Sequence, residues 1–555
     1  MPLMQAIRLA VLSVALVAAG ARLGPTAGQD ATPPGDATPI APPIVETAAG
    51  PVRGMRDSGA VRFLGVPYAA SPLEDLRWRS PQPHASWDAV RDATRSGNRC
   101  PQPGESPDAP LVGDEDCLVL DVTAPVTASP DAPLPVMVWL HGAGAGVGSG
   151  SDFDARRLAT DGGVVVVTVN YRLGALGFFG HPGLDGSGGF GLVDQQTALR
   201  WVRDNIRAFG GDPGNVTLFG ESSGGMDTCA HLTSPTAAGL FDRAIVQSGS
   251  CLMELPANAM FPGVPATSIW ASPAEAGALG GMLAADVGCA SDDPDAALGC
   301  LRALPPAELF ASPFAAAYGR AAYGNVVIPE NPADALRAGR FHRVPVVSGA
   351  TRDEATFFAA AFTDPPIDAA RYAALLDEAF GDDAARIEAV YPLAHFDHPA
   401  LAWAAVVTDA AWVCPTLEAN RLFAAHVPTW SYEFADRDVP ALIPSPGFPL
   451  GASHGSEVAY LFDVPGFDPV FTPEQRALAD AMVRYWSAFA ATGDPNAPGL
   501  PAWPPFDADA DVPFTLALAP GEGGIAPVEL GAEHNCGFWD EIGSVLDGPD
   551  GESGR

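Results

Sequence analysis

Short, mostly apolar runs recur along the central part of this chain, and they constrain its fold more than any other feature. They are LPVMVWL (134–140), GVVVVTVNY (163–171), NVTLFG (215–220), RAIVQSGS (243–250) and VPVVSGA (344–350). A strand with one solvated face alternates apolar and polar residues, so runs this continuous predict strands buried on both faces of a sheet. Residues 194–211 instead carry apolar residues at helical spacing and end at a Gly pair, which predicts a helix. This alternation predicts an α/β fold with a mostly parallel central sheet and helices on both faces.

The two ends of the chain have a different composition. Residues 1–27 contain a basic residue followed by an apolar run too short to cross a bilayer, which predicts a secretory signal peptide. Residues 28–43 are rich in Pro, Thr and Ala and predict a linker. We expect one catalytic domain over 44–542 and a flexible tail over 543–555. Residues 252–340 are less regular and are expected to form excursions that shape a pocket. No stretch after the signal reaches 18 uninterrupted apolar residues, so we expect a secreted protein, extracellular or periplasmic, without a membrane span.

Charge argues against several partners. The net charge is −36, and the 30 basic residues are all Arg. An acidic surface repels nucleic acid and anionic membranes, so neither is an expected partner. The run Asp507, Asp509 and Asp511 imitates the start of a calcium loop. Val512 and Leu518 stand where that loop needs Gly and Glu, so a solvated turn is the better interpretation and no metal is expected.

Two serines stand in the G-x-S-x-G pattern of serine hydrolase nucleophiles, Ser222 and Ser453. The pattern has meaning only on a sharp turn between a strand and a helix, where the hydroxyl projects into a cleft. Ser222 has this context, because a predicted strand precedes it and residues 226–232 can begin a helix. Ser453 follows 438–450, which contains four prolines and no strand pattern. We therefore predict Ser222 as the nucleophile and Ser453 as a loop residue.

A serine hydroxyl needs a base, usually a histidine, and in α/β-hydrolases the order along the chain is Ser, acid, His. Seven histidines follow Ser222, and His454 lies late in the chain in a glycine-flanked loop, as this order requires. Asp353 and Glu354 both follow the predicted strand at 344–350. The residues alone do not choose between these two carboxylates.

The chain resembles the type-B carboxylesterase/lipase family, which includes cholinesterases and bacterial para-nitrobenzyl esterases. The resemblance covers most of the chain and rests on FLGVPYA (63–69), DEDCLVLDV (114–122), NYRLGALGFF (170–179), FGGDPGNVTLFGESSGG (209–225) and CGFWDEI (536–542). It implies an α/β-hydrolase fold and a triad of Ser222 as nucleophile, His454 as base and Glu354 as acid. It also implies an acyl-enzyme mechanism that needs no cofactor.

The resemblance further implies an oxyanion hole formed by the backbone amides of Ala143, Gly144 and Ser223. The family carries H-G-G-G and then an aromatic residue, whereas this chain has His-Gly-Ala-Gly-Ala at 141–145. An alanine keeps its amide donor, but its Cβ strains the loop if φ is positive. The alanine at position 145 in place of the aromatic residue is expected to reshape the pocket and open it.

An even number of cysteines behind a signal peptide favours disulfides, and the chain has eight. The resemblance implies three bridges: Cys100–Cys117, Cys289–Cys300 and Cys414–Cys536. Cys229 and Cys251 have no counterpart in that set, and the sequence leaves a fourth bridge open.

The loop at 101–116 bears on the substrate. Cholinesterases bind their cationic substrate on an aromatic residue in this loop, and here it contains no Trp, Tyr or Phe. We therefore expect a carboxylesterase of short- to medium-chain or aryl esters rather than of choline esters. A lipase or polyester hydrolase acting at surfaces is the closest alternative. A catalytically silent recognition protein of the same family is a second one, although the intact triad argues against it. The oligomeric state is left open.

Overall fold

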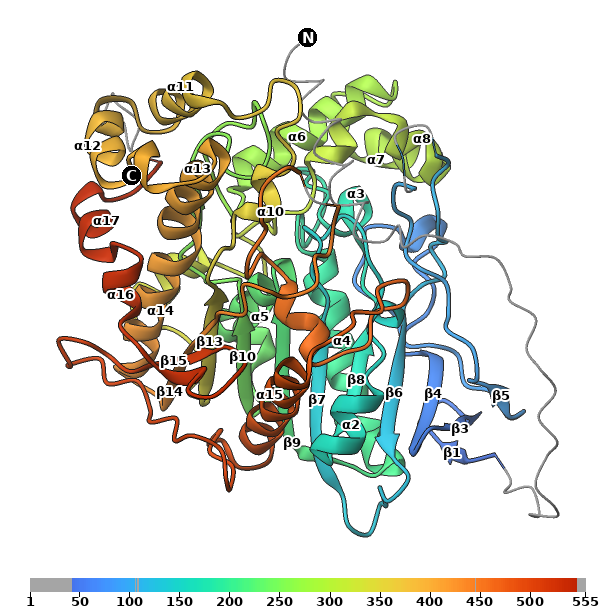
Figure 1. The fold of residues 1–555 in the computed structure, drawn as a ribbon. Helices are drawn as coiled ribbons and strands as arrows, with labels where there is room; N and C mark the ends of the chain where they lie inside the picture. Colours follow the sequence, from blue (N-terminus) through green and yellow to red (C-terminus); the bar gives the residue numbers. More distant parts are fainter. Residues whose placement is uncertain (1–41, 105, 107–108, 445, 547–555) are drawn as a thin grey trace, which may run out of the picture.

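The computed structural model describes residues 42–104, 106, 109–444 and 446–546. The predicted signal peptide, residues 28–41 of the predicted linker and residues 547–555 of the predicted tail lie outside these residues. An 11-stranded sheet forms the centre of the molecule (Figure 1), in the order β16-β15-β14-β13-β10-β9-β7-β8-β6-β4-β3. Its strands are β3 (Met55–Asp57), β4 (Ala60–Pro67), β6 (Val119–Pro125), β7 (Leu134–Leu140), β8 (Val165–Val169), β9 (Gly211–Glu221), β10 (Arg243–Gln247), β13 (Val346–Thr351), β14 (Thr429–Phe434), β15 (Thr515–Leu518) and β16 (Ile525–Val528).

The predicted strand runs all lie in this sheet, as β7, β8, β9, β10 and β13. From β8 to β15 each strand is parallel to its neighbours. The outer pairs at both edges are antiparallel. The sheet is therefore mostly parallel, as the continuous apolar runs predicted.

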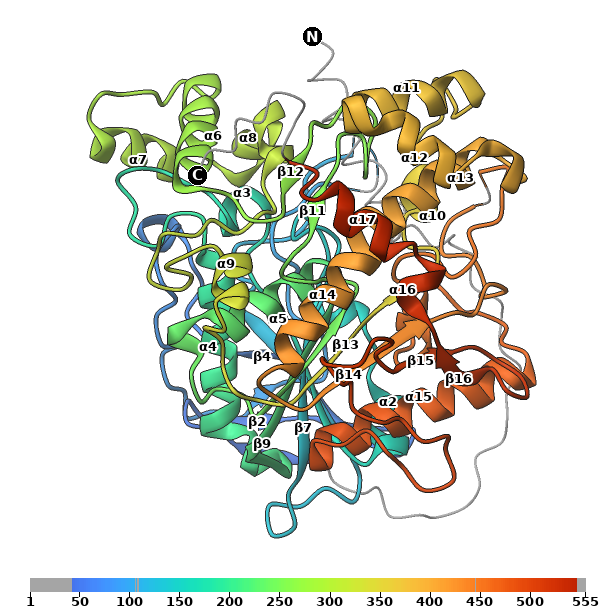
Figure 2. The same cartoon turned by 90° about the vertical axis from the view of Figure 1, so that its left-hand side faces the viewer.

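Helices cover both faces of the sheet (Figure 2). On one face lie α2 (Arg156–Gly162) and α15 (Pro473–Thr492), and on the other α4 (Phe190–Asn205), α5 (Ser223–Thr233) and α14 (Cys414–Ala424). Alternate residues of each central strand enter two different cores: Val138 of β7 packs with the α4 and α5 side, whereas Met137 and Trp139 pack with the α2 and α15 side. This two-sided burial is the reason that the strands are apolar at nearly every position.

The helix predicted over 194–211 is shorter at its C-terminal end. The α-helix α4 ends at Asn205 and a 3₁₀ turn, η4 (Ile206–Phe209), follows it. Gly210 then adopts a left-handed conformation with φ of 85°, so the Gly pair terminates the 3₁₀ turn rather than the α-helix.

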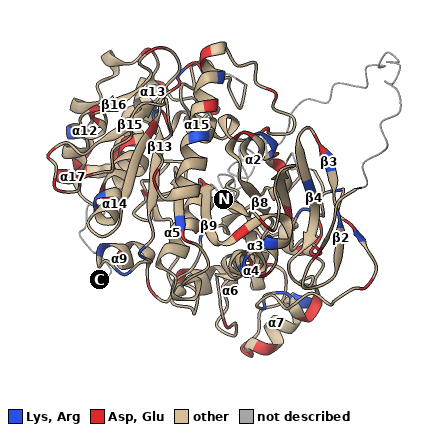
Figure 3. Cartoon of the chain, turned by 90° about the horizontal axis from the view of Figure 1, so that it is seen from below, with Lys and Arg blue, Asp and Glu red and all other residues tan. Residues whose placement is uncertain are grey.

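The excursions lie above the carboxyl ends of the parallel strands, at the top of Figure 1. Residues 252–340 supply α6 (Pro273–Asp286), α7 (Pro294–Ala303) and α8 (Pro306–Ala311) there. They also supply α9 (Pro332–Arg337), which lies lower, beside α5 (Figure 2). A second group, α11 (Ala369–Phe380), α12 (Ala384–Val390) and α13 (Pro399–Val407), comes from the connection between β13 and β14. Figure 3 shows that charged residues lie mainly on outer helices and loops such as α7, while the central strands are largely uncharged.

Among the described residues, one helical run is long and apolar enough to cross a membrane by length and composition, Pro399–Ala424. It consists of α13, a π-helical turn η9 (Thr408–Val413) and α14. Because 78% of its apolar window is buried inside the protein, it has the burial of a core helix.

Candidate active site

The turn between β9 and α5 is a sharp strand–helix elbow, and Ser222 lies at its tip. Its φ and ψ are 58° and −126°, a backbone conformation that few side-chain-bearing residues adopt. The neighbouring glycines make the turn possible, since a Cβ at Gly220 would collide with the carbonyl oxygen of Gly224. A Cβ at Gly224 would collide in turn with the carbonyl oxygen of Leu140. Local sequence therefore builds the strained turn in which the serine projects from the sheet.

Three polar side chains form a buried hydrogen-bonded chain at this elbow. His454 Nε2 lies 2.8 Å from Ser222 Oγ, and His454 Nδ1 lies 2.5 Å from Glu354 Oε2. Ser222 and His454 are each 8% exposed, and Glu354 is fully buried. A hydroxyl, an imidazole and a carboxylate in this order have the geometry that activates a serine for nucleophilic attack.

The two adjacent carboxylates after β13 have separate contacts. Glu354 faces the imidazole, and its other oxygen accepts a 2.7 Å hydrogen bond from the Thr351 amide. Asp353 instead accepts a 3.0 Å hydrogen bond from the amide of Ala452 and pairs with Arg437. Asp353 thus fixes the backbone of the loop that carries His454, a contact that the sequence did not indicate.

Ser453 occupies no elbow. In the described part of 435–455 no strand precedes it, and the element that follows is a short 3₁₀ helix, η10 (Ser456–Tyr460). Its amide donates to the carbonyl oxygen of Gly451 at 2.9 Å, which makes it part of a tight turn. The second G-x-S-x-G match therefore lacks the geometry of a nucleophile.

Two further carboxyl groups lie near the imidazole. Glu221 Oε1 is 3.3 Å from His454 Nε2, and Glu457 is fully buried next to the same site. Burial by itself lowers the pKa of His454, but the carboxylates of Glu221 and Glu354 outweigh it and raise the pKa to about 9. Burial raises the pKa of Glu221 to about 7 and that of Glu457 to about 8. The imidazolium form of His454 is therefore electrostatically stabilised.

Two aromatic rings pack on the imidazole. The ring centroid of Trp412 lies 4.5 Å and that of Phe358 5.1 Å from the ring of His454, and the two aromatic rings stack on each other. Trp412 belongs to the π-helical turn η9, an irregularity that often marks functional sites. The Thr408 hydroxyl at the start of this turn accepts a 3.0 Å hydrogen bond from the amide of Ala355, next to the acid. No pattern in the sequence predicted that Trp412 and Phe358 would pack on His454.

The loop after β7 lies beside the elbow. Ala143, Gly144 and Ala145 have φ values of 68°, 65° and 51°, so the condition under which an alanine strains this loop is met. Within the part of the chain that the structure describes, the amides of Ala143, Gly144 and Ser223 donate to no protein acceptor. Three uncommitted amide donors therefore lie next to Ser222, as an oxyanion hole requires.

Position 145 is not open to solvent. Ala145 is 1% exposed, and a Cβ on Gly319 would collide with the carbonyl oxygen of Gly144. Neighbouring backbone thus closes over this loop. The expectation that the missing aromatic side chain opens the pocket stays a prediction.

Comparison with known proteins identifies the family. The Carboxylesterase family model matches residues 41–523. The chain belongs to the carboxylesterase family. It is 33% identical over 506 residues to a cocaine esterase of Oryctolagus cuniculus, covering 84% of this chain and 91% of that protein. Pyrethroid hydrolase Ces2e of Rattus norvegicus is 32% identical over 511 residues, covering 84% of this chain and 85% of the relative.

Solved structures agree with this assignment. A thermophilic PNB esterase and a second PNB esterase align with TM-scores of 0.71 and 0.70, at 30% and 31% identity. Each alignment covers 87% of this chain and 97% of the neighbour. The predicted α/β-hydrolase fold is confirmed, and the protein is a carboxylic ester hydrolase.

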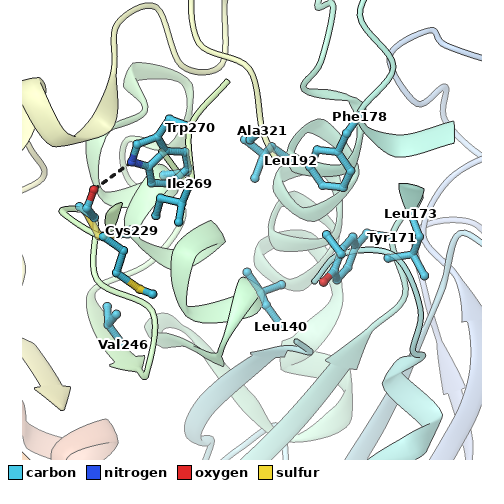
Figure 4. Close-up of a cluster of buried hydrophobic side chains, with 14 of the residues drawn as sticks. Leu140, Tyr171, Leu173, Phe178, Leu192, Cys229, Val246, Ile269, Trp270 and Ala321 are labelled. Atoms are coloured by element: carbon cyan, nitrogen blue, oxygen red, sulfur yellow. Dashed lines mark hydrogen bonds between the residues drawn. A yellow bond between two sulfur atoms is a disulfide. The ribbon is translucent and has the colours of Figure 1, made fainter. Parts of the chain in front are cut away.

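All eight cysteines of this carboxylesterase are bridged. The pairs implied by the family resemblance are present, and so is the fourth bridge that the sequence left open: Cys100–Cys117, Cys289–Cys300, Cys414–Cys536 and Cys229–Cys251. The fourth joins α5 to the segment after β10, beneath Trp270, whose indole N–H donates to the Cys251 carbonyl oxygen at 2.9 Å (Figure 4). Helix α5, which follows Ser222, is thereby covalently anchored.

Among the described residues of this carboxylesterase, no group of three or more His, Cys, Asp or Glu side chains has the arrangement of a metal site. The acidic run that resembles a calcium loop forms an exposed turn, in which the Asp509 amide donates to Asp507 Oδ1 at 3.0 Å. The Asp507 carboxylate thus takes part in forming the turn, as the solvated-turn interpretation predicted.

Proposed function

We propose that this carboxylesterase hydrolyses short- to medium-chain or aryl esters through an acyl-enzyme formed on Ser222. The observation that carries the proposal is the buried hydrogen-bonded chain Ser222–His454–Glu354 at the strand–helix elbow. The catalytic unit is one domain over residues 44–542.

In the first half of the reaction, Ser222 Oγ attacks the ester carbonyl carbon while His454 Nε2 takes the hydroxyl proton. The tetrahedral intermediate then collapses as the imidazolium returns this proton to the departing alkoxide, which leaves as the alcohol. Water repeats the cycle on the acyl-enzyme, giving the carboxylic acid and free Ser222. Glu354 accepts the Nδ1–H bond throughout, which fixes the tautomer and stabilises the imidazolium.

The oxyanion of each tetrahedral intermediate takes its hydrogen bonds from the amides of Ala143, Gly144 and Ser223. These donors have no protein acceptor among the described residues. Ser223 also begins helix α5, where the first-turn amides and the helix dipole favour negative charge. Because the donors are fixed before substrate arrives, little reorganisation accompanies the reaction.

The substrate class rests on the loop at 101–116 and on the relatives. The loop has no aromatic residue for a cationic choline group. The related proteins are named as a cocaine esterase, pyrethroid hydrolases and PNB esterases, which favours organic esters as substrates. Four disulfides and the predicted signal peptide support export to an oxidising compartment.

The decisive experiment is a p-nitrophenyl ester series of increasing acyl length, assayed with the wild type, Ser222→Ala and Ser453→Ala. We expect Ser222→Ala to lower kcat by roughly 10⁴-fold or more, because the nucleophile is lost. Ser453→Ala is the matched control and is expected to keep the wild-type rate.

Inactivity of Ser453→Ala with full activity of Ser222→Ala would overturn the assignment of the nucleophile. A maximum at long acyl chains, with a rate that jumps at an emulsion or polymer surface, would favour the lipase or polyester hydrolase alternative. An inert wild type would favour a recognition protein.

A further inference from the structure

The loop at 141–145 holds an unfavourable backbone conformation. Three successive residues have positive φ, and two of them, Ala143 and Ala145, carry a Cβ. Side-chain-bearing residues disfavour this region, so the loop relaxes to negative φ unless its surroundings hold it. Relaxation would turn its amide groups away from the position of an oxyanion.

The contact that opposes this relaxation comes from the residue after the nucleophile. Ser223 Oγ accepts a 2.9 Å hydrogen bond from the amide of Ala145, and both residues are almost fully buried. The Gly174 amide donates to the Ala145 carbonyl oxygen at 2.8 Å, so the end of the loop is held on both sides of this residue.

The beginning of the loop is held by Tyr171. Its hydroxyl donates to the carbonyl oxygen of His141 at 2.6 Å, and its ring stacks on the His141 ring with centroids 4.5 Å apart. Figure 4 shows Tyr171 beside the end of β7, next to Leu140. Burial raises the pKa of Tyr171, and the hydroxyl of Ser223 acts in the opposite direction as a hydrogen-bonding neighbour. Two buried hydroxyls therefore hold the loop: that of Tyr171 binds its beginning, and that of Ser223 binds its end.

We propose that the Ser223 side chain is a positioning residue that keeps the 141–145 loop in its positive-φ conformation, so that the amides of Ala143 and Gly144 point at the reacting carbonyl. This inference rests on the proposed function, and it gives Ser223 two separate tasks. Its backbone amide is an oxyanion donor, while its hydroxyl fixes the loop that carries the other two donors. The tether runs directly between the loop and the residue next to Ser222, so it sets their relative position.

The test is a double-mutant cycle of Ser223→Ala and Ala143→Gly. Removing the hydroxyl is expected to lower kcat by roughly 10- to 100-fold with little change in KM, which is less than the loss of a whole oxyanion donor. Glycine adopts positive φ without strain. The loss of kcat caused by Ser223→Ala is therefore expected to be severalfold smaller in the Ala143→Gly background.

A transition-state readout separates positioning from general damage. A trifluoromethyl ketone forms a tetrahedral adduct with the serine and loads the oxyanion hole. Its affinity should fall in Ser223→Ala by the same factor as kcat/KM. Ser223→Thr keeps a hydroxyl and should therefore retain most of the ketone affinity and most of the wild-type kcat/KM. Thr233→Val removes a hydroxyl at the far end of α5, bonded to the Ala230 carbonyl oxygen, and is the control expected to leave both unchanged.

The proposal is wrong if Ser223→Ala keeps the wild-type kcat. It is also wrong if Ser223→Ala lowers kcat by the same factor whether residue 143 is Ala or Gly. It is also wrong if the ketone binds Ser223→Ala as tightly as the wild type. A failure of the proposed function would look different: Ser222→Ala would remain active, or the wild type would be inert.

Discussion

At the scale of single residues, the electrostatic surroundings of His454 are the most distinctive feature of the site. The imidazole lies among buried carboxyl groups, with Glu354 on Nδ1 and Glu221 Oε1 3.3 Å from Nε2. Glu221 directly precedes Ser222, so the strand that positions Ser222 also positions a carboxyl group next to the imidazole. The base is therefore expected to titrate on the alkaline side of pH 7, near its pKa of about 9.

Glu221→Gln is expected to change the pH at which His454 titrates. Its ionised carboxylate stabilises the protonated imidazole, so removing this charge lowers the pKa of His454. The pH dependence of kcat/KM should then keep its shape while the midpoint of its acid limb moves from near 9 towards the ordinary histidine range.

Glu457→Gln is the matched control for this prediction. Burial raises the pKa of Glu457 to about 8. Glu457 also raises the pKa of His454, but it contributes less than Glu221 and Glu354 do. Its acid limb should move less than that of Glu221→Gln. A larger shift in Glu457→Gln would show that Glu221 is not the charge that acts on the base.

At the scale of elements, helix α5 is held behind the nucleophile by contacts that leave almost no space. Cβ atoms at Gly224 and Gly225 would collide with carbonyl oxygens of Leu140 and Gln247, so the helix approaches both β7 and the end of β10. The Cys229–Cys251 bridge adds a covalent link on the same side. The elbow is thus fixed by close packing and by a crosslink.

Removing this bridge in a Cys229→Ala/Cys251→Ala variant should lower the free energy of unfolding by about 3 kcal/mol, because the unfolded chain regains the freedom of a short loop. Its cysteines are 22 residues apart, whereas Cys414 and Cys536 are 122 apart. Urea unfolding should therefore give a larger loss, about 5 kcal/mol, for Cys414→Ala/Cys536→Ala. The reverse order would mean that native-state strain or packing, not chain entropy, sets the stability of these bridges.

At the scale of the whole molecule, a second buried histidine joins the C-terminal segment to the body of the fold. His534 Nδ1 lies 2.6 Å from Asp409 of η9, and its Nε2 lies 2.7 Å from Glu433 of β14. Because η9 also carries Trp412 against His454, this contact links the last helices α16 (Leu530–Glu533) and α17 (Cys536–Ile542) to the wall of the active site.

This link predicts a dependence of stability on pH. Burial alone lowers the pKa of His534, but hydrogen bonds to Asp409 and Glu433 raise it to about 10. Since the folded pKa lies above the unfolded value of about 6.5, the stabilisation is complete below that value and is lost as the pH rises to about 10. The loss should be on the order of a few kcal/mol.

His534→Gln provides the comparison. Urea unfolding at a series of pH values from 6 to 10 should show the difference between wild type and variant shrinking as the pH rises. A difference that stays constant over this range would mean that His534 does not bind its proton more tightly in the folded protein.

The sequence by itself determined the sheet and the elbow. Buried strands appear as local apolar runs, and the strained turn at Ser222 needs small residues next to it. Both features can therefore be predicted from residues that are adjacent in the sequence. The unusual alanine at position 143 was also visible, through comparison with the glycine of the related family, but its positive φ came from the structure. The choice of His454 among seven histidines already required the family resemblance.

The residues alone left open which of two adjacent carboxylates faces the imidazole, and the family resemblance assigned Glu354, which lies against His454 in the structure. Only the tertiary structure decided that Cys229 pairs with Cys251. It alone brought Glu221 and Trp412 to His454, and the Ser223 hydroxyl to the amide of Ala145. His454 lies 232 positions from Ser222 and 100 from Glu354 along the chain. Contacts between such distant positions are set by how the excursions pack on the sheet, and no local pattern of residues records that packing.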